Sequence, residues 1–286
     1  MIKTKQNTLK DTAKLTGIGL HSGEKVKLEI IPAPEDYGIV FRRSDVKGFS
    51  NIVRADYRNV SKTQLGTCIS NDDGTMISTI EHLMAALWGS GIDNALIDVS
   101  GPEIPILDGS SKLFVKLFQE TGIYQQASDR KIVQVNKEVE VRENDKFAKV
   151  LPSENFSIDL EIDFASKAIS NQKFTFENGE RGFLDEFSDA RTFGFAHEVE
   201  YMRKNGLARG GSLENAIVIQ EDKILNKEGL RYNNEFVRHK ILDCIGDFYL
   251  AGKRISGAFK AYKTGHGLNN QLLRKLFADR QAYDIV

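Results

Sequence analysis

Alternation of hydrophobic and polar residues predicts β-strands in the first half of the chain. Val26, Leu28 and Ile30 share one face of such a strand, and the segment CISNDDGTMIS predicts a hairpin that turns at Asp73 and Gly74. The predicted elements are strands over residues 25–31 and 38–42, the hairpin, a helix over 79–88, a strand over 94–99 and a helix over 111–121. This half therefore runs strands, helix, strand, helix.

The second half repeats this order after a polar stretch, residues 124–130, which we interpret as a linker. Its predicted elements are strands over 132–141, 147–151 and 156–164, a helix over 235–250, a strand over 255–262 and a helix over 268–283. The repeated order predicts an α+β fold of two similar domains, residues 1–125 and 131–286, each a β-sheet layered against α-helices. Residues 193–222 are predicted to form a β-α-β insertion in the second domain.

Charge and cysteine content argue against several classes of protein. Thirty-nine basic and 40 acidic residues give a net charge of −1, which disfavours a general attraction to nucleic acid or anionic lipid. The two cysteines, Cys68 and Cys244, have no CxxC partner, so neither a disulfide framework nor a thiolate zinc cluster is indicated. No stretch approaches the roughly 18 apolar residues of a membrane span. We therefore expect a cytoplasmic monomer without stable membrane insertion.

The segment FVRHKILDCIGD places His239, Asp243 and Asp247 four residues apart in one predicted helix. Each step of four advances only about 40° around the helix, so these side chains share one stripe, which is the geometry of a metal half-site. A separate apolar stripe docks the helix on a core and consists of Val237, Ile241, Cys244, Ile245 and Phe248. We therefore expect the two acids to lie outside the core. A solvated helix face with i,i+4 pairs is the alternative interpretation.

A further candidate ligand, His82, lies in the segment STIEHLMAAL directly after Glu81. With His239 and Asp243 it would complete a two-histidine, one-carboxylate site with an open position, where zinc lowers the pKa of water to about 7 and Glu81 can take the proton. The same ligands suit an iron(II) oxygenase, and no HExxH motif is present. Alternatively, Glu81 and Ser78 form a capping box at the start of the helix.

His266 lies in the segment KTGHGLNN between two glycines, which allow the backbone to turn and expose the ring. A nearby carboxylate such as Asp247 would raise the pKa of His266 and make it a general acid. A loop histidine without function is the alternative. We assign no role to His21, and we expect His197 to be an exposed helix residue.

These residues lie within segments that closely resemble one family, the UDP-3-O-acyl-N-acetylglucosamine deacetylases, zinc amidases that commit precursors to lipid A synthesis. The likeness runs in order from Gly17 to Asn270, which is nearly the whole chain. The matching segments are GIGLHSG, STIEHLMAAL, GIDN, EIPILDGSS, ARTFGF, GLARGGSLENAIV, FVRHKILDCIGD and GAFKAYKTGHGLNN. The resemblance implies hydrolysis of the N-acetyl group of a UDP-3-O-(3-hydroxyacyl)-N-acetylglucosamine, with release of acetate, at a site between the two domains.

The resemblance also implies roles for individual residues. Zinc, or iron(II) in the cell, would be bound by His82, His239 and Asp243. Glu81 would be the general base. His266, held by Asp247, would protonate the leaving amine or steady the oxyanion. Thr192, in ARTFGF, would contact the tetrahedral intermediate.

Contacts with the remaining parts of the substrate are implied in the same way. Phe193 would pack near the sugar, Phe164 would stack on uracil, and the diphosphate would face Lys240, Lys146 and Lys263. The insertion would form an apolar passage for the acyl chain, lined by Val199, Ala208, Gly211, Ser212 and Val218, where each buried CH₂ contributes roughly 0.8 kcal/mol.

Two alternative functions stay open at this point. One is a non-haem iron(II) oxygenase that uses the same triad. The other is an acyl or nucleotide-sugar binding protein without catalysis. Glu81 and His266 argue against a pure binding protein, because binding alone requires neither.

Overall fold

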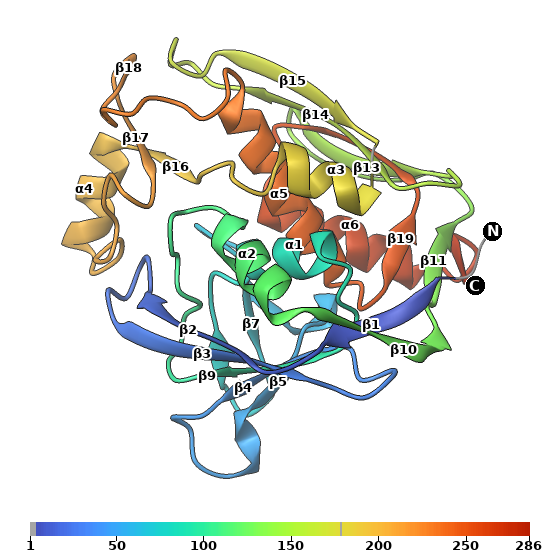
Figure 1. The fold of residues 1–286 in the computed structure, drawn as a ribbon. Coiled ribbons are helices and arrows are strands. Elements are labelled where there is room, and N and C mark those ends of the chain that lie inside the picture. The colour runs from blue at the N-terminus through green and yellow to red at the C-terminus, as the bar shows by residue number, and fades with distance from the viewer. Residues whose placement is uncertain (1–3, 178) are drawn as a thin grey trace.

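Two five-stranded β-sheets with the same strand topology form the framework of the protein (Figure 1). The structure is a computed structural model that describes residues 4–177 and 179–286, without the side chain of Phe49. One sheet contains, in spatial order, β2 (Ala13–Ile18), β3 (Lys25–Pro32), β9 (Ala95–Val99), β4 (Ile39–Arg43) and β5 (Ile52–Arg54). The other contains β12 (Val139–Glu143), β13 (Lys146–Leu151), β20 (Ala258–Tyr262), β14 (Ser157–Asp163) and β15 (Asn171–Phe176).

The pairing within the two sheets is equivalent strand by strand. In each sheet the third and fourth strands in spatial order are parallel, and the other neighbours are antiparallel. The helices are equivalent as well, because α1 (Glu81–Gly89) and α2 (Lys112–Thr121) flank β9 along the chain as α5 (Glu235–Tyr249) and α6 (His266–Ala278) flank β20. The predicted α+β fold of two similar domains is therefore confirmed.

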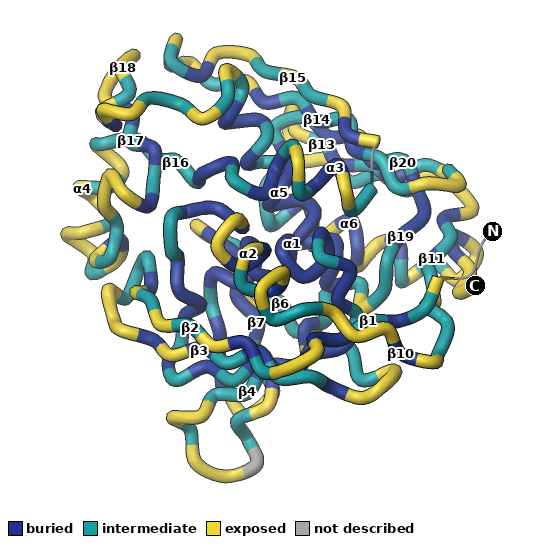
Figure 2. The backbone as a smooth tube through the Cα atoms, viewed as in Figure 1, coloured by how far each residue is buried: buried dark blue, intermediate teal, exposed yellow. Residues whose placement is uncertain are grey.

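The helices α1 and α5 pack against each other between the two sheets, and both are almost wholly buried (Figure 2). Apolar residues of the two domains form one continuous core around them. This packing explains why α5 is apolar on one side and polar on the other, since each side meets a different neighbour. Among the described residues, no helix has the length and hydropathy needed to cross a membrane.

Several smaller elements surround this framework. They are a ribbon of β1 (Lys5–Leu9) and β10 (Ile123–Asp129), the sheet β19 (Arg254–Ser256), β11 (Ile132–Val135) and β21 (Tyr283–Ile285), the sheet β6 (Val60–Lys62), β7 (Cys68–Ser70) and β8 (Met76–Ile77), the helix α3 (Gly179–Glu186), and two 3₁₀ turns, Phe49–Asn51 and Tyr57–Asn59. The predicted hairpin around Asp73 and Gly74 is present as β7 and β8.

The segment predicted as a linker, residues 124–130, is not irregular, because all of it but Arg130 belongs to β10 and pairs with β1. The pairing satisfies its backbone, and Gln126 points inward, where it donates to the carbonyl of Ala33 and accepts from Asn94. A two-stranded ribbon needs little apolar surface of its own. The sequence of β10 is therefore polar and lacks the alternating apolar pattern by which a strand is predicted.

The predicted strands over 132–141 and 255–262 are each two strands. β11 and β19 pair with each other, whereas β12 and β20 belong to the large sheet. The second break falls at Gly257, where a Cβ atom would lie 2.9 Å from a Val150 methyl and 3.0 Å from a Val135 methyl. The chain therefore changes sheets where only glycine fits. The last helix is also shorter than predicted, because Tyr283 belongs to β21, which pairs with β11.

The predicted β-α-β unit is present as β16 (Phe193–Phe195), α4 (Ala196–Lys204) and β17 (Ile217–Gln220), followed by β18 (Lys223–Ile224). It protrudes from one end of the molecule (Figure 1). Two backbone hydrogen bonds, from Arg209 to the carbonyl of His21 and from Gly210 to that of Leu20, join its loop to the first domain.

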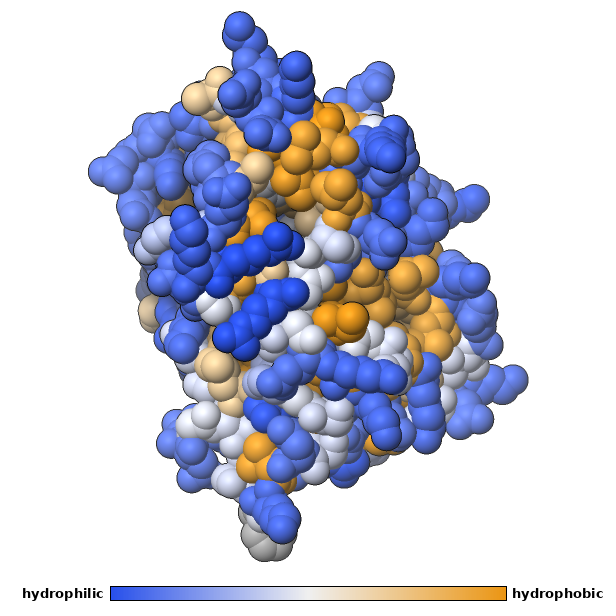
Figure 3. All heavy atoms as spheres, turned by 90° about the vertical axis from the view of Figure 1, so that its left-hand side faces the viewer, coloured by the Kyte–Doolittle hydropathy of each residue, from blue (hydrophilic) through white to orange (hydrophobic). Residues whose placement is uncertain are grey.

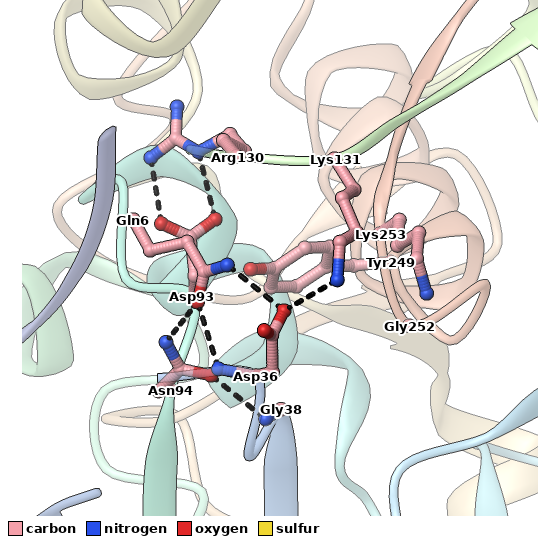
Figure 4. Close-up of a pocket in the computed structure, with 10 residues that line it drawn as sticks. All are labelled: Gln6, Asp36, Gly38, Asp93, Asn94, Arg130, Lys131, Tyr249, Gly252 and Lys253. Carbon is pink, nitrogen blue, oxygen red and sulfur yellow. Dashed lines mark hydrogen bonds and ion pairs between the residues drawn. The ribbon is translucent and has the colours of Figure 1, made fainter. Parts of the chain in front are cut away.

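A polar cleft of about 80 Å³ marks another junction between the domains (Figure 4). Arg130 donates to both carboxylate oxygens of Asp93, at 2.8 and 2.9 Å, and the hydroxyl of Tyr249 donates to the carbonyl of Ile92 at 2.6 Å. Lys131 pairs with a further carboxylate of the first domain. These charges neutralise one another across the junction, so we interpret the cleft as a joint between the domains.

Candidate active site

Three potential metal ligands converge where α1 meets α5. The Nε2 atoms of His82 and His239 lie 3.6 and 3.3 Å from Oδ1 of Asp243, and one potential ligand atom from each side chain lies within 4.8 Å of the other two. The imidazole rings are nearly perpendicular, with centroids 5.0 Å apart. All three residues are buried. The expectation that Asp243 and Asp247 lie outside the core is therefore wrong, because α1 covers the polar stripe of α5.

The protonation and hydrogen bonding of these side chains suit a divalent metal. The buried Oδ1 of Asp243 has no hydrogen-bond partner within the described part of the chain. Nδ1 of His239 lies 3.0 Å from the carbonyl of Ala190 and donates to it, which leaves Nε2 with its lone pair. Burial lowers the pKa of His239 to about 3, so this ring is neutral, as a metal ligand must be. The residues present therefore fit a metal site, in which they offer two nitrogens and one oxygen.

Asp243 is an anion despite its burial. Burial alone would raise its pKa, but the neighbouring His239 and Lys240 outweigh that effect and hold the pKa well below the ordinary value. Nζ of Lys240 donates to Oδ2 of Asp243 at 2.8 Å. Oδ2 of Asp243 is thus bound by Lys240, and Oδ1 faces the imidazoles of His82 and His239.

Glu81 is the first residue of α1, and its side chain does not cap the helix. The N-cap position is Ile80, without a side-chain hydrogen bond, and Oε2 of Glu81 accepts from the backbone amide of Thr67 at 3.0 Å. The capping-box alternative with Ser78 is therefore wrong. Burial raises the pKa of Glu81, which brings a carboxylate closer to the proton affinity that a general base needs.

His266 is held on the other side of Glu81 by a carboxylate. Its Nδ1 donates to Oδ2 of Asp247 at 2.8 Å, and its Nε2 lies 3.9 Å from Oε1 of Glu81. His266 is the first residue of α6 and does not lie in a free loop. The positive end of the helix dipole at this N-terminus disfavours a cationic imidazole. Burial lowers the pKa of His266, but attraction to Asp247 outweighs it and raises the pKa to about 9. The imidazole is therefore protonated at neutral pH.

Two residues that support this carboxylate were not singled out in the sequence. The hydroxyl of Thr67 donates to Oδ1 of Asp247 at 2.5 Å, and the amide of Asn269 donates to Oδ2 at 2.8 Å. Asn269 follows His266 by three residues, so the i,i+3 spacing on one helix face was the available signal. Thr67 offered none, because it comes from a distant strand end. Its backbone binds Glu81 and its side chain binds Asp247, so one residue positions two carboxylates.

A polar cleft of about 310 Å³ lies on the second domain beside the cluster. Its lining contains the three lysines and the aromatic residue that were predicted to contact substrate, Lys146, Lys240, Lys263 and Phe164. The ring of Phe193 lies near Phe164, with centroids 5.8 Å apart, and near His239, at 6.2 Å. Phe193 therefore stands between this cleft and the metal ligands.

Thr192 precedes Phe193 and is fixed by its backbone. Its amide donates to the carbonyl of Gly109 at 2.8 Å, and its carbonyl accepts from Ile217 at 2.8 Å. The preceding residue, Arg191, is buried and paired with the equally buried Glu235 of α5. The segment ARTFGF is thus tied to both domains and to the helix that carries His239.

An apolar passage of about 330 Å³ runs beside this segment through the insertion. Its lining includes the residues predicted for an acyl chain, Val199, Ala208, Gly211, Ser212 and Val218, together with Thr192 and Phe193. Leu213 and Leu225, which also line it, are 43% and 39% exposed. Figure 3 faces this end of the molecule and shows hydrophobic side chains gathered in patches among hydrophilic ones. His197 of α4 is exposed, as predicted.

Comparison with known proteins assigns the family. A model of the family described as UDP-3-O-acyl N-acetylglycosamine deacetylase matches residues 6–278. Proteins named UDP-3-O-acyl-N-acetylglucosamine deacetylase from Vibrio parahaemolyticus and Vibrio cholerae are 49% identical over 282 residues, which is 98% of this chain and 92% of each relative. A protein of the same name from Idiomarina loihiensis is 48% identical over 285 residues, 99% of this chain and 92% of the relative. This chain therefore belongs to the UDP-3-O-acyl N-acetylglycosamine deacetylase family.

Proposed function

We propose that this protein hydrolyses the N-acetyl amide of a UDP-3-O-acyl-N-acetylglucosamine, with release of acetate, as a step of lipid A biosynthesis. The observation that carries the proposal is the convergence of His82, His239 and Asp243 beside the pair Glu81 and His266, in a chain of this family. Family membership does not favour the oxygenase or the pure binding protein, because the matched family and relatives are named as deacetylases.

The metal that His82, His239 and Asp243 would hold is zinc in this proposal, and iron(II) would suit the same donors. Such an ion polarises a carbonyl and lowers the pKa of water to about 7. The remaining chemistry falls to side chains of this chain. Glu81, buried and held by Thr67, takes the proton of the attacking water.

His266 is proposed to supply a positive charge beside the negative oxygen of the intermediate and a proton for the departing amine. Because Asp247 keeps its ring protonated, Nε2 can first stabilise the negative oxygen of the tetrahedral intermediate and then protonate the departing amine. Thr192 lies next to Phe193 at the start of β16, and its hydroxyl is proposed to donate to the same oxygen. The proposed acid and base, Nε2 of His266 and Oε1 of Glu81, therefore lie 3.9 Å apart. Burial raises the pKa of Glu81, and the charge of the neighbouring His266 opposes that effect and favours the ionised base.

The parts of the substrate are proposed to lie along the apolar passage, which Phe193 lines, and along the cleft that contains Phe164, whose ring lies beside that of Phe193. The uracil would lie on Phe164 and the diphosphate near Lys146, Lys240 and Lys263, which share one cleft. The acyl chain would occupy the apolar passage through the insertion, residues 193–222. We also propose that the two domains comprise residues 1–125 and residues 131–286. The cytoplasmic location and the monomeric state stay predictions.

The test is acetate release from purified protein and UDP-3-O-acyl-N-acetylglucosamine, with and without a chelator. We expect release that stops on chelation and returns with added zinc. The variant Glu81→Gln should keep its metal and lose turnover, whereas Glu120→Gln, an exposed glutamate of α2, should behave as the wild type. Absence of acetate from zinc-loaded wild-type protein would refute the proposal.

A further inference from the structure

His21 lies where two cavities meet. It contributes to the lining of the apolar passage and to that of a second cleft, of about 540 Å³, formed by residues 61–66 and their neighbours. Among the residues that the structure describes, no other side chain lines both. The second cleft leads towards Glu81, since a Cβ atom on Gly66, which lines it, would lie 2.8 Å from Oε1 of Glu81. His21 therefore marks the boundary between the polar reaction site and the apolar passage.

The backbone of His21 is held firmly in this place. Its amide donates to Oε1 of Glu103 at 2.8 Å, the amide of Ser22 donates to Oε2 at 2.8 Å, and the carboxylate of Glu103 is buried. The carbonyl of His21 accepts from Arg209 of the insertion. Because the loop is fixed from both domains, the imidazole has a defined position relative to the passage.

The imidazole has one nitrogen without a partner. Its Nε2 lies 3.4 Å from the carbonyl of Leu65, and its Nδ1 is buried without a hydrogen-bond partner in the described chain. A carbonyl only accepts, so Nε2 carries the proton in this contact. In the tautomer with its one proton on Nε2, Nδ1 is an acceptor. A buried acceptor without a donor is unfavourable, and a hydroxyl group is one donor that would satisfy it.

We propose that Nδ1 of His21 accepts a hydrogen bond from a hydroxyl group near the ester end of the substrate's acyl chain. This inference rests on the proposed function, because it requires that an acyl chain pass from the site near Glu81 into the passage. The first atoms of that chain must cross the boundary that His21 occupies. The ester offers only acceptors, so a hydroxyl on the chain is its one donor here. His21 is thus a specificity-determining residue for hydroxyacyl substrates.

An apolar passage alone would not select a hydroxylated acyl chain over an unmodified one. A hydrophobic pocket distinguishes poorly between an alkyl chain and the same chain with a hydroxyl, whereas a site with a buried polar group discriminates against the ligand that leaves this group unpaired. For one hydrogen bond of ordinary strength we expect about a tenfold preference in kcat/KM for the hydroxylated chain.

The experiment compares two substrates of equal chain length, UDP-3-O-(3-hydroxyacyl)-N-acetylglucosamine and its analogue without the chain hydroxyl. We expect wild-type protein to favour the first about tenfold, and His21→Ala to lose that preference by slowing only the hydroxylated substrate. His21→Asn, whose amide oxygen reaches the position of Nδ1, should restore it. Ser22→Ala is the matched control in the same loop and should keep the wild-type ratio. His21→Leu serves if His21→Ala does not fold.

The outcomes separate the inference from the proposed function. Wild-type protein that releases acetate from neither substrate contradicts the proposed function itself. Wild-type protein that uses both equally, or a His21→Ala variant that slows both by the same factor, contradicts this inference alone. A preference that Ala abolishes and Asn restores, with metal content unchanged, supports it.

Discussion

Gly246 lies in α5 where this helix meets the backbone of Glu81 in α1. The two helices lie at the centre of the molecule (Figure 2). A Cβ atom at this position would lie 2.1 Å from the backbone carbonyl oxygen of Glu81, and real Cβ atoms essentially never approach below 3.0 Å. The variant Gly246→Ala therefore has to separate the helices by about 0.9 Å, the difference between these two distances. The next residue of α1 is His82, and Asp243 lies one turn before Gly246.

This displacement acts directly on the proposed metal ligands, since His82 moves with α1 while Asp243 and His239 move with α5. Metal–ligand distances tolerate only about 0.2 Å, so a shift of 0.9 Å exceeds that tolerance several times. We expect metal affinity to fall by about 10- to 100-fold, the range seen when outer supports of a site are lost. Stability should fall less, because overpacking costs about 1–3 kcal/mol while alanine in place of glycine in a helix recovers about 1 kcal/mol.

The assay is metal content after dialysis against graded chelator, measured beside thermal unfolding. Ile245→Val is the control, because it removes one buried methyl from the neighbouring position and costs about 1 kcal/mol without forcing the helices apart. We expect this control to lose stability and to keep its metal. If folded Gly246→Ala retains wild-type affinity, the spacing of α1 and α5 does not set the ligand geometry.

Further predictions concern the support of the site and the joint between the domains. Thr67→Val removes the hydroxyl that donates to Asp247 and should lower kcat about tenfold or more, with KM and metal content kept, because hydrogen bonds to charged groups contribute about 1.5–3 kcal/mol; an unchanged kcat contradicts this. Glu235→Gln leaves the buried Arg191 poorly compensated and should cost about 3–5 kcal/mol in urea unfolding, whereas a loss below 1 kcal/mol would show that the pair contributes little. Tyr249→Phe removes a buried hydrogen bond at the joint and should cost about 1 kcal/mol with activity kept. Metal at 100 times its Kd should stabilise the folded protein by about 2.7 kcal/mol, seen as a higher Tm in calorimetry, and an unchanged Tm contradicts metal binding to the folded state.

Periodicity predicted the elements that carry the fold and missed those without a pattern of their own. β3 and α5 were found within one residue of their bounds, because each buries a regular apolar set. β15 is an edge strand with alternate residues exposed, and α3 follows it in the chain; neither was predicted. The break between β19 and β20 depends on Gly257, whose lack of a side chain matters only once Val135 and Val150 are packed around it.

The residues of the candidate site that lie within α5 were easier to predict than those contributed by distant segments. Within α5 the spacing of His239 and Asp243 is visible because a helix converts sequence separation into direction. His82, from the other half of the chain, was added to them as the third member of a two-histidine, one-carboxylate site and by the resemblance. The contributions of Thr67 and of the carbonyl of Ala190 were not predictable, because backbone and hydroxyl groups leave no signature until distant strands meet.

The burial of the acids shows what duplication of the domain adds to this site. A single domain would leave the polar stripe of its helix in water, where Asp243 and Asp247 would be hydrated and solvent would weaken the attraction between Asp247 and His266. Packing α1 against α5 removes that water, so each charge requires a partner from the protein. Asp247 finds three donors, whereas Oδ1 of Asp243 finds none among the described residues. The two acids of one helix stripe therefore differ in role. Asp247 keeps His266 protonated, and Asp243 is the candidate ligand for the metal.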